Sequence, residues 1–265
     1  MIKRFTTHYR IHKLLLVGML VFMYVPIIYL VTVSFHQDPY SVFPYEFTIQ
    51  NYEAVLDGAY NPELRNSLQI GFGSGLISMI VGASAAWAVA RYRFPLRYAV
   101  AVFFVLPLVV PTLITGIGSS MLHSQFSGLD NGILLATLTQ SVRGSAFAFL
   151  IMMTQLSQYP TELDHAAKVY GANRVQRLKE LTLPLLWGSL LGAFLIATIV
   201  SFNDYNLTFF TVGASGTIPT LTFAQMKYGL EASLFALSAL IVIVSLAIIF
   251  STSLLIQFSG ILDRD

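Results

Sequence analysis

The sequence contains no cysteine, and only 11% of its 265 residues are charged. Without cysteine, the chain can form neither disulfides nor a thiolate metal site. Soluble globular domains have about 25% charged residues, and a chain with so few charges cannot cover the surface of a soluble domain. Because 55% of the residues are hydrophobic, the composition instead indicates an integral membrane protein.

Further absences limit the chemistry of the chain. It has no glycine-rich loop that ends in Lys-Ser or Lys-Thr, so we do not expect it to bind ATP through such a loop. No nucleophile stands beside a base, and no histidine has an acidic partner at the spacing of metal ligands. The histidines are His8, His12, His36, His123 and His165. We therefore expect no enzyme, no metal site, no cofactor and no nucleic-acid partner.

Six apolar runs approach or exceed the roughly 20 residues that a helix needs to cross a bilayer. They lie near residues 14–35, 67–90, 98–122, 132–156, 185–202 and 233–258. The first run is long, contains Pro26 and lacks a small-x-small cleavage site, so it is a membrane helix rather than a signal peptide. We predict an all-α membrane protein whose residues 1–265 form a single transmembrane domain.

The orientation follows from the distribution of lysine and arginine between short loops. Six spans place both termini and the second and fourth loops on one side. That side carries Lys3, Arg4, Arg10, Lys13, Arg91, Arg93, Arg97, Lys168, Arg174, Arg177, Lys179 and Arg264. The other side carries only Arg65 and Lys227, with seven acidic residues. We therefore predict that both termini are cytoplasmic.

Two segments are expected to depart from straight membrane helices. Residues 36–66 are polar and aromatic, which predicts short helices on the outer face. Pro107 and Pro111 lie inside the third span, where each removes a backbone donor and bends the helix. Such a bend is tolerable where the bundle lines a cavity, so we interpret these prolines as a gating kink.

Residues 160–184 are polar and charged although they lie between two apolar runs. Thr161, with Asp164 three residues later, predicts the start of a helix. Gly171 allows a bend between two short helices, and Pro184 suits the first turn of the next span. One interpretation is a helix on the membrane surface that binds anionic lipid headgroups.

The stretch "HAAKVYGANRVQRLKELTLP" resembles the loop motif of permease subunits of type I ABC importers. Ala166, Ala167, Gly171, Leu183 and Pro184 match that motif at its spacing. Leu181 replaces an isoleucine of the motif, and His165 stands where the motif has glutamate. The resemblance implies the fold of these permeases, six transmembrane helices with a cytoplasmic coupling helix that docks on an ATPase subunit.

The same resemblance assigns roles within the coupling loop. It implies that Ala166, Ala167 and Gly171 pack closely against the ATPase, with Ala172 beside them. Because His165 is not acidic, Glu162 or Asp164 is the candidate for the acidic contact.

Other stretches resemble the permeases of the spermidine/putrescine type, namely "RYRFPLR" after the second span and "SFNDYNLTFFTVG" from Ser201. This likeness implies a pathway subunit in a bacterial inner membrane, paired with a second, different permease and fed by an extracytoplasmic solute-binding protein. Two cytoplasmic ATPase subunits would bind ATP and Mg²⁺. The expected solute is a polyamine; the alternatives are an organophosphonate such as an aminophosphonate, an iron complex or another small solute. An ion-gradient-driven carrier is the competing class.

Five residues are candidates for the substrate pathway: Gln140, Arg143, Asn203, Asp204 and Tyr205. A charge in mid-membrane costs about 2.5–3.5 kcal/mol, so Arg143 should face the pathway or a partner permease. Gln140 shares its helical face. The resembling spermidine/putrescine-type permeases typically have two successive acidic residues at this place; here Asn203 occupies the first position, which leaves Asp204 as the single acid. Asp204 could hold the cationic end of a solute or cap a helix, and together Arg143 and Asp204 would suit a zwitterion.

Overall fold

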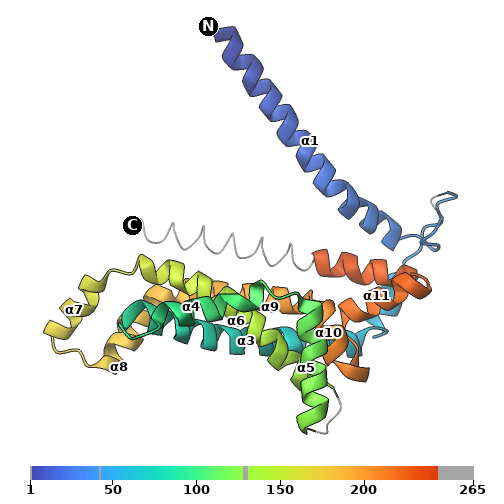
Figure 1. Cartoon of the computed structure of the whole chain (residues 1–265). Helices are drawn as coiled ribbons and strands as arrows, with labels where there is room; N and C mark the ends of the chain where they lie inside the picture. Colours follow the sequence, from blue (N-terminus) through green and yellow to red (C-terminus); the bar gives the residue numbers. More distant parts are fainter. Residues whose placement is uncertain (1, 42, 128–130, 244–265) are drawn as a thin grey trace. The chain divides into compact units, whose positions relative to one another are not determined.

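The computed structural model describes residues 2–41, 43–127 and 131–243 (Figure 1). Within these ranges the regular structure is helical, apart from a single bridge between His36 and Phe47. The helices are α1 (Ile2–Ser34), α2 (Gln50–Leu56), α3 (Asn61–Arg91), α4 (Arg97–Val105), η1 (Leu106–Leu108), α5 (Thr112–Ser127), α6 (Ile133–Ser157), α7 (Thr161–Val169), α8 (Arg174–Gln176), η2 (Arg177–Thr182), α9 (Leu183–Phe202), α10 (Asn206–Thr211), η3 (Gly213–Ser215) and α11 (Ile218–Tyr228). A further apolar helix covers Ala232–Ile243. The predicted all-α class is confirmed.

The chain packs as two compact units, Met1–Tyr60 with Gln225–Asp265, and Asn61–Ala224. The first unit contains the long helix α1 and the polar segment that follows it. Ser34 Oγ and Tyr52 Oη are 2.7 Å apart, which ties the end of α1 to α2. Tyr60 Oη lies 3.0 Å from Glu231 Oε2, and burial raises the pKa of the Tyr60 phenol. The predicted short helix after the first span is confirmed by α2.

The second unit is built on α3, α6 and α9, which pack against one another along their lengths (Figure 1). Small residues let these helices approach closely, as in other membrane bundles. A Cβ on Gly82 would lie 2.6 Å from Ala148 Cβ and from the carbonyl oxygen of Ser145, so α3 and α6 meet there without room for a side chain. Toward one end the core is apolar and includes Phe149 and Met152, each 2% exposed.

Among the described residues, four helices are long and apolar enough to cross a membrane: His12–Ser34, Asn61–Arg91, Ile133–Ser157 and Arg174–Phe202. They correspond to the first, second, fourth and fifth predicted spans. The predicted sixth span, 233–258, begins in the helix Ala232–Ile243, and its remainder lies outside the described residues. The prediction that residues 1–265 form one domain stays a prediction.

The third predicted span, 98–122, is broken rather than kinked. Arg97–Leu108 and Thr112–Phe126 form a pair of helices bent by 98°, and Figure 1 shows α5 turned away from α4. Pro107 lies in η1, and Pro111 directly precedes α5. The two prolines are four residues apart, and neither has a backbone N–H group. The ladder of helical hydrogen bonds therefore cannot continue through them. The Pro111 carbonyl instead accepts the N–H of Ile114 at 3.1 Å and starts α5.

The fifth span also begins earlier than predicted, because the chain is helical from Arg174 to Phe202. Pro184 lies in the first turn of α9, as predicted, but a π-turn, η2, precedes α9 without a break in the helix. The N–H of Leu183 bonds to the carbonyl of Leu178, five residues back. This widened turn lets the helix continue into Pro184, which has no N–H of its own to donate.

Candidate functional site

The coupling loop folds as α7, a tight turn, α8 and the π-turn η2. The N-cap of α7 is Pro160, without a side-chain hydrogen bond, so Thr161 and Asp164 do not form the expected cap. Asp164 Oδ2 instead pairs with Arg177 Nη1 at 3.0 Å. This ion pair joins α7 to η2 and fixes the loop to the start of the fifth span.

Gly171 ends α7 in a left-handed conformation, with φ of +86°. The N–H of Gly171 bonds to the carbonyl of Lys168, and that of Ala172 bonds to Ala167, the pattern of a Schellman motif. No atom lies within 4 Å of the position where a Cβ would stand. The backbone conformation, rather than close packing within this chain, therefore requires glycine at this position.

The outer surface of α7 presents apolar side chains to its surroundings. Leu163 is 44% exposed, Val169 86% and Tyr170 91%. The residues of the resembling motif are distributed around this surface. Glu162, His165, Ala166, Leu183 and Pro184 are exposed, and Ala167, Ala172 and Leu181 are half-buried. Their role in ATPase docking remains a prediction.

The cap of α8 was not predicted from the sequence. The Asn173 side chain accepts the N–H of Gln176, and the Gln176 side chain accepts the N–H of Asn173, both at 2.9 Å. This reciprocal capping box restarts the helix two residues after Gly171. The pattern Asn-x-x-Gln after a glycine was the signal that could have revealed it.

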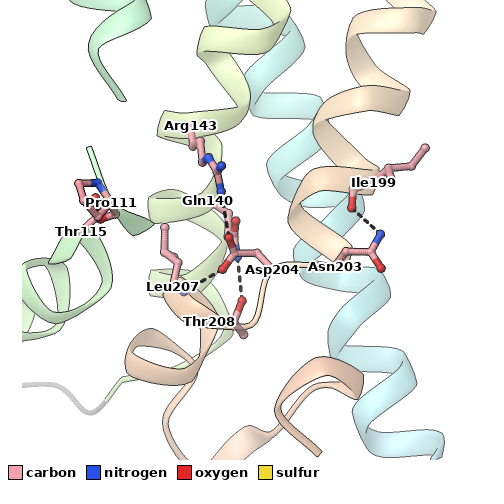
Figure 2. Close-up of polar contacts among 9 residues, drawn as sticks. All are labelled: Pro111, Thr115, Gln140, Arg143, Ile199, Asn203, Asp204, Leu207 and Thr208. Carbon is pink, nitrogen blue, oxygen red and sulfur yellow. Dashed lines mark hydrogen bonds and ion pairs between the residues drawn. The ribbon is translucent and has the colours of Figure 1, made fainter. Parts of the chain in front are cut away.

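A second site lies at the other end of the unit, where α6 meets α10. Arg143 Nη1 pairs with Asp204 Oδ2 at 3.2 Å (Figure 2). Asp204 Oδ1 also accepts the N–H of Leu207 at 2.7 Å, which caps α10. Gln140 Nε2 donates to Thr208 Oγ1 at 2.7 Å. The structure thus brings together three of the five predicted pathway residues, namely Gln140, Arg143 and Asp204.

The other two predicted residues have different surroundings. Asn203 Nδ2 donates back to the carbonyl of Ile199 at 3.0 Å, and Figure 2 shows its side chain directed away from Arg143. Tyr205 stacks on Phe223, with ring centroids 4.2 Å apart, and also contacts Phe209. Asn203 therefore does not join the charged cluster, whereas Tyr205 belongs to an aromatic cluster that begins next to Asp204 in the chain.

The two charges of the pair differ in accessibility. The Asp204 side chain is 6% exposed and the Arg143 side chain 30%. Arg143 Nε is buried and has no hydrogen-bond partner in the described part of the chain. Arg143 is therefore the more accessible charge of the pair, whereas both oxygens of Asp204 bond within the chain.

The short helix α10, which carries Thr208, was not predicted from the sequence. It has only six residues, too few for a helical period to be recognised, and it forms because Asp204 caps it and α5 and α6 pack against it. The break after Pro111 directs α5 to this place. Both the predicted prolines and the predicted charges thus help to form the region around α10.

The sequence matches a family described as binding-protein-dependent transport system inner membrane component, over residues 78–260. It is 27% identical over 243 residues to PhnV of Salmonella choleraesuis, described as a 2-aminoethylphosphonate transport system permease; the match covers 91% of this chain and 92% of PhnV. It is 26% identical over 236 residues to the spermidine/putrescine transport system permease protein PotC of Haemophilus influenzae, covering 88% and 91% of the two chains.

Solved structures agree with the fold. A bacterial ABC transporter involved in the import of the acidic polysaccharide alginate has a TM-score of 0.69 at 18% identity, covering 93% of this chain and 96% of that one. The MetNI methionine ABC transporter has a TM-score of 0.60 at 17% identity, covering 78% and 95%. At these identities the likeness shows the fold alone, and it confirms the predicted fold of an ABC-importer permease.

Proposed function

Because the chain belongs to the family of binding-protein-dependent transport system inner membrane components, we propose that it forms half of the membrane pathway of an ATP-driven importer for a small aminoalkyl solute. The chain is a permease subunit and not an enzyme, and ATP hydrolysis belongs to a separate subunit. We infer a second, different permease as its partner, two ATPase subunits that bind ATP and Mg²⁺, and an extracytoplasmic solute-binding protein. Both termini and the coupling loop are on the cytoplasmic side.

The arrangement of the two sites supports this function. Figure 1 shows α7 and α10 at opposite ends of the bundle of α3, α6 and α9. The apolar surface of α7 suits a docking contact with an ATPase, and the Arg143–Asp204 pair at the far end suits contact with the solute. A movement imposed on the coupling loop would then change access to the charged pair. The coupling loop makes a carrier driven only by an ion gradient the weaker alternative.

The Arg143–Asp204 pair is the observation on which we base the solute class. A solute ammonium group that displaces Arg143 from Asp204 leaves the guanidinium unpaired in a poorly hydrated place, which is costly. A zwitterion avoids this cost, because its anionic end can pair with Arg143 while its ammonium group pairs with Asp204. Because the Arg143 side chain retains 30% exposure, its guanidinium is accessible to such an anion. A 2-aminoethylphosphonate-like zwitterion is therefore our first candidate.

A polyamine, the solute expected from the sequence, is the second candidate. It is favoured by the aromatic cluster of Tyr205, Phe209 and Phe223, which follows Asp204. Aromatic faces and a carboxylate are the groups that commonly bind alkylammonium ions. This solute would need Asp204 and the aromatic rings, whereas Arg143 would have to turn away.

Uptake into proteoliposomes that contain the full complex and its binding protein tests both the importer class and the solute class. Labelled 2-aminoethylphosphonate, putrescine and spermidine would be compared with and without ATP. We expect phosphonate uptake to fall at least 10-fold in Arg143→Gln, because one charge-assisted hydrogen bond is worth about 1.5–3 kcal/mol. Arg65→Gln is the matched control, because Arg65 is an exposed arginine near the start of α3. This variant should transport normally.

The outcomes separate the alternatives. Uptake of polyamines alone, unchanged in Arg143→Gln, would refute the zwitterion and leave Asp204 as the pathway charge. Uptake of any of these solutes that continues without ATP would refute the importer itself.

A further inference from the structure

A groove of about 770 Å³ lies between the end of α3, the connection to α4 and the coupling loop. Five arginines line it: Arg91, Arg93, Arg97, Arg174 and Arg177. Asp164 is the single carboxylate among the lining residues. The groove therefore carries a formal charge of +4 from these six side chains, five positive and one negative. A concave surface with this excess of guanidinium groups attracts anions.

Contacts within the chain hold the groove in place without neutralising it. Asp164 is already engaged with Arg177. The guanidinium of Arg91 lies over the rings of Tyr159 and Trp87, 4.2 Å and 5.0 Å from their centroids. Stacking of this kind fixes the plane of a guanidinium but leaves its charge unpaired. In the described chain, Arg91 Nε also lacks a hydrogen-bond partner.

The groove opens at the boundary of the membrane. Arg91 is the last residue of the candidate span Asn61–Arg91, and Arg97 is the first residue of the next apolar helix pair. Between and beside them, Tyr92, Leu96 and Tyr98 are 60%, 78% and 70% exposed. Tyrosine and tryptophan side chains concentrate at the depth of lipid headgroups, with the ring in the apolar layer and the polar group outside. These span ends and aromatic residues favour a depth near the lipid phosphates for Arg91, Arg93 and Arg97.

We propose that this groove binds the phosphate of an anionic phospholipid, with phosphatidylglycerol as the model ligand. Arginine binds phosphate oxygens through two parallel hydrogen bonds. Leu96 and Tyr98 line an adjoining pocket that shares Arg93 and Arg97 with the groove, and they give the acyl chains an apolar contact. A zwitterionic headgroup brings an ammonium group toward the same arginines and binds less well. Thr161, Asp164 and His165 of α7 line the groove. The apolar residues Leu163, Val169 and Tyr170 do not, so this apolar surface stays open to a docking protein while the lipid occupies the groove.

Binding at this place would link two segments that the chain itself joins weakly. Arg93 follows the second span, and Arg174 begins the helix of the fifth span. A phosphate between them acts as a shared counter-ion for the coupling loop and for the α3–α4 connection. The stability of the coupling loop would then depend on the lipid composition of the membrane.

Lipid binding to the full chain in nanodiscs tests the proposal without reference to transport. Phosphatidylglycerol would be titrated into phosphatidylcholine nanodiscs, and its binding would be followed with a fluorescent analogue of phosphatidylglycerol. The variants Arg93→Gln and Arg174→Gln change exposed side chains that make no ion pair in the described residues, so they should fold. Each should weaken phosphatidylglycerol binding about five-fold, which corresponds to about 1 kcal/mol per arginine near an anionic surface.

Two controls carry the same loss of charge outside the groove. Lys179→Gln lies in η2 and Arg65→Gln at the start of α3, and neither residue lines the groove. Both should bind phosphatidylglycerol like the unaltered chain. Equal weakening in variants and controls would overturn the proposal, because it would indicate diffuse attraction to the surface.

Two further measurements distinguish other occupants. Glycerol phosphate or inorganic phosphate that displaces the fluorescent lipid at micromolar concentration would identify a site for free anions and overturn the lipid assignment. Association with the ATPase, measured in detergent free of anionic lipid, would be compared across the same variants. If Arg93→Gln and Arg174→Gln lose that association but retain lipid binding, the groove is a protein contact and the proposal is wrong.

Discussion

Removal of the negative charge of Asp204 should destabilise the fold, because it leaves Arg143 unpaired in the membrane. The substitution Asp204→Asn is the sharpest perturbation, since an asparagine oxygen can still accept the N–H of Leu207 and cap α10. Breaking a buried ion pair from one side costs about 3–5 kcal/mol. Arg143 retains 30% exposure, so its charge is partly solvated, and we expect a loss of about 2 kcal/mol instead.

The effect is measurable as thermal unfolding of the purified full chain in detergent. A change of 1 kcal/mol shifts the Tm of a protein of about this size by roughly 2–4 °C, so Asp204→Asn should lower it by about 4–8 °C. Glu180→Gln removes an exposed carboxylate and should leave the Tm within about 1 °C, because surface substitutions of this kind change stability little.

A double-mutant cycle isolates the pair from its surroundings. Arg143→Met alone leaves Asp204 without its cation, and Arg143→Met combined with Asp204→Asn removes both charges. We expect the combined loss to be smaller than the sum of the single losses by about 1–2 kcal/mol, because residues in contact couple. Additive losses would refute the reasoning, since they would mean that Arg143 and Asp204 do not interact in the folded chain.

Three further predictions concern Gly171, Asn173 and Gly82. Gly171→Ala places a side chain in a left-handed conformation and should destabilise the coupling loop by about 1 kcal/mol. Asparagine tolerates that conformation, so proteolysis of the coupling loop should increase in Gly171→Ala and not in Gly171→Asn. Asn173→Ala removes the capping box and should also increase cleavage there, because an N-cap is worth about 1 kcal/mol. Gly82→Ala introduces a Cβ 2.6 Å from α6 and should lower the Tm, whereas Gly118→Ala, with nothing within 4 Å, should not; equal effects would show that α3 and α6 are not closely packed.

The spans could be predicted because a bilayer leaves the backbone few alternatives. Inside hydrocarbon, each N–H and carbonyl group must be paired within the helix, so the length of an apolar run nearly determines the element. The first, second and fourth spans accordingly match their apolar runs within a few residues, apart from an earlier start at Asn61. The same argument identified Arg143 as a residue that needs a partner.

The remaining features depend on contacts between distant segments. Pro107 and Pro111 predict a bend, but the 98° angle depends on α5 packing against α10. The pairing of Arg143 with Asp204 joins residues 61 positions apart, and no local pattern specifies the depth of either. By contrast, the capping box at Asn173 is a local signal, and it could have been recognised.

The continuous helix from Arg174 to Phe202 gives the coupling loop a mechanical relation to the charged pair. Its 29 residues correspond to a rod of about 43 Å at 1.5 Å per residue. One end begins immediately after the capping box of Asn173, and the other ends two residues before Asp204. A tilt of roughly 2° about one end moves the other by about 1.5 Å, more than a pair at 3.2 Å can absorb without separating. Arg174–Phe202 can therefore transmit a movement of the coupling loop to the charged pair, and the π-turn η2 near its coupling-loop end interrupts the regular α-helical hydrogen bonding.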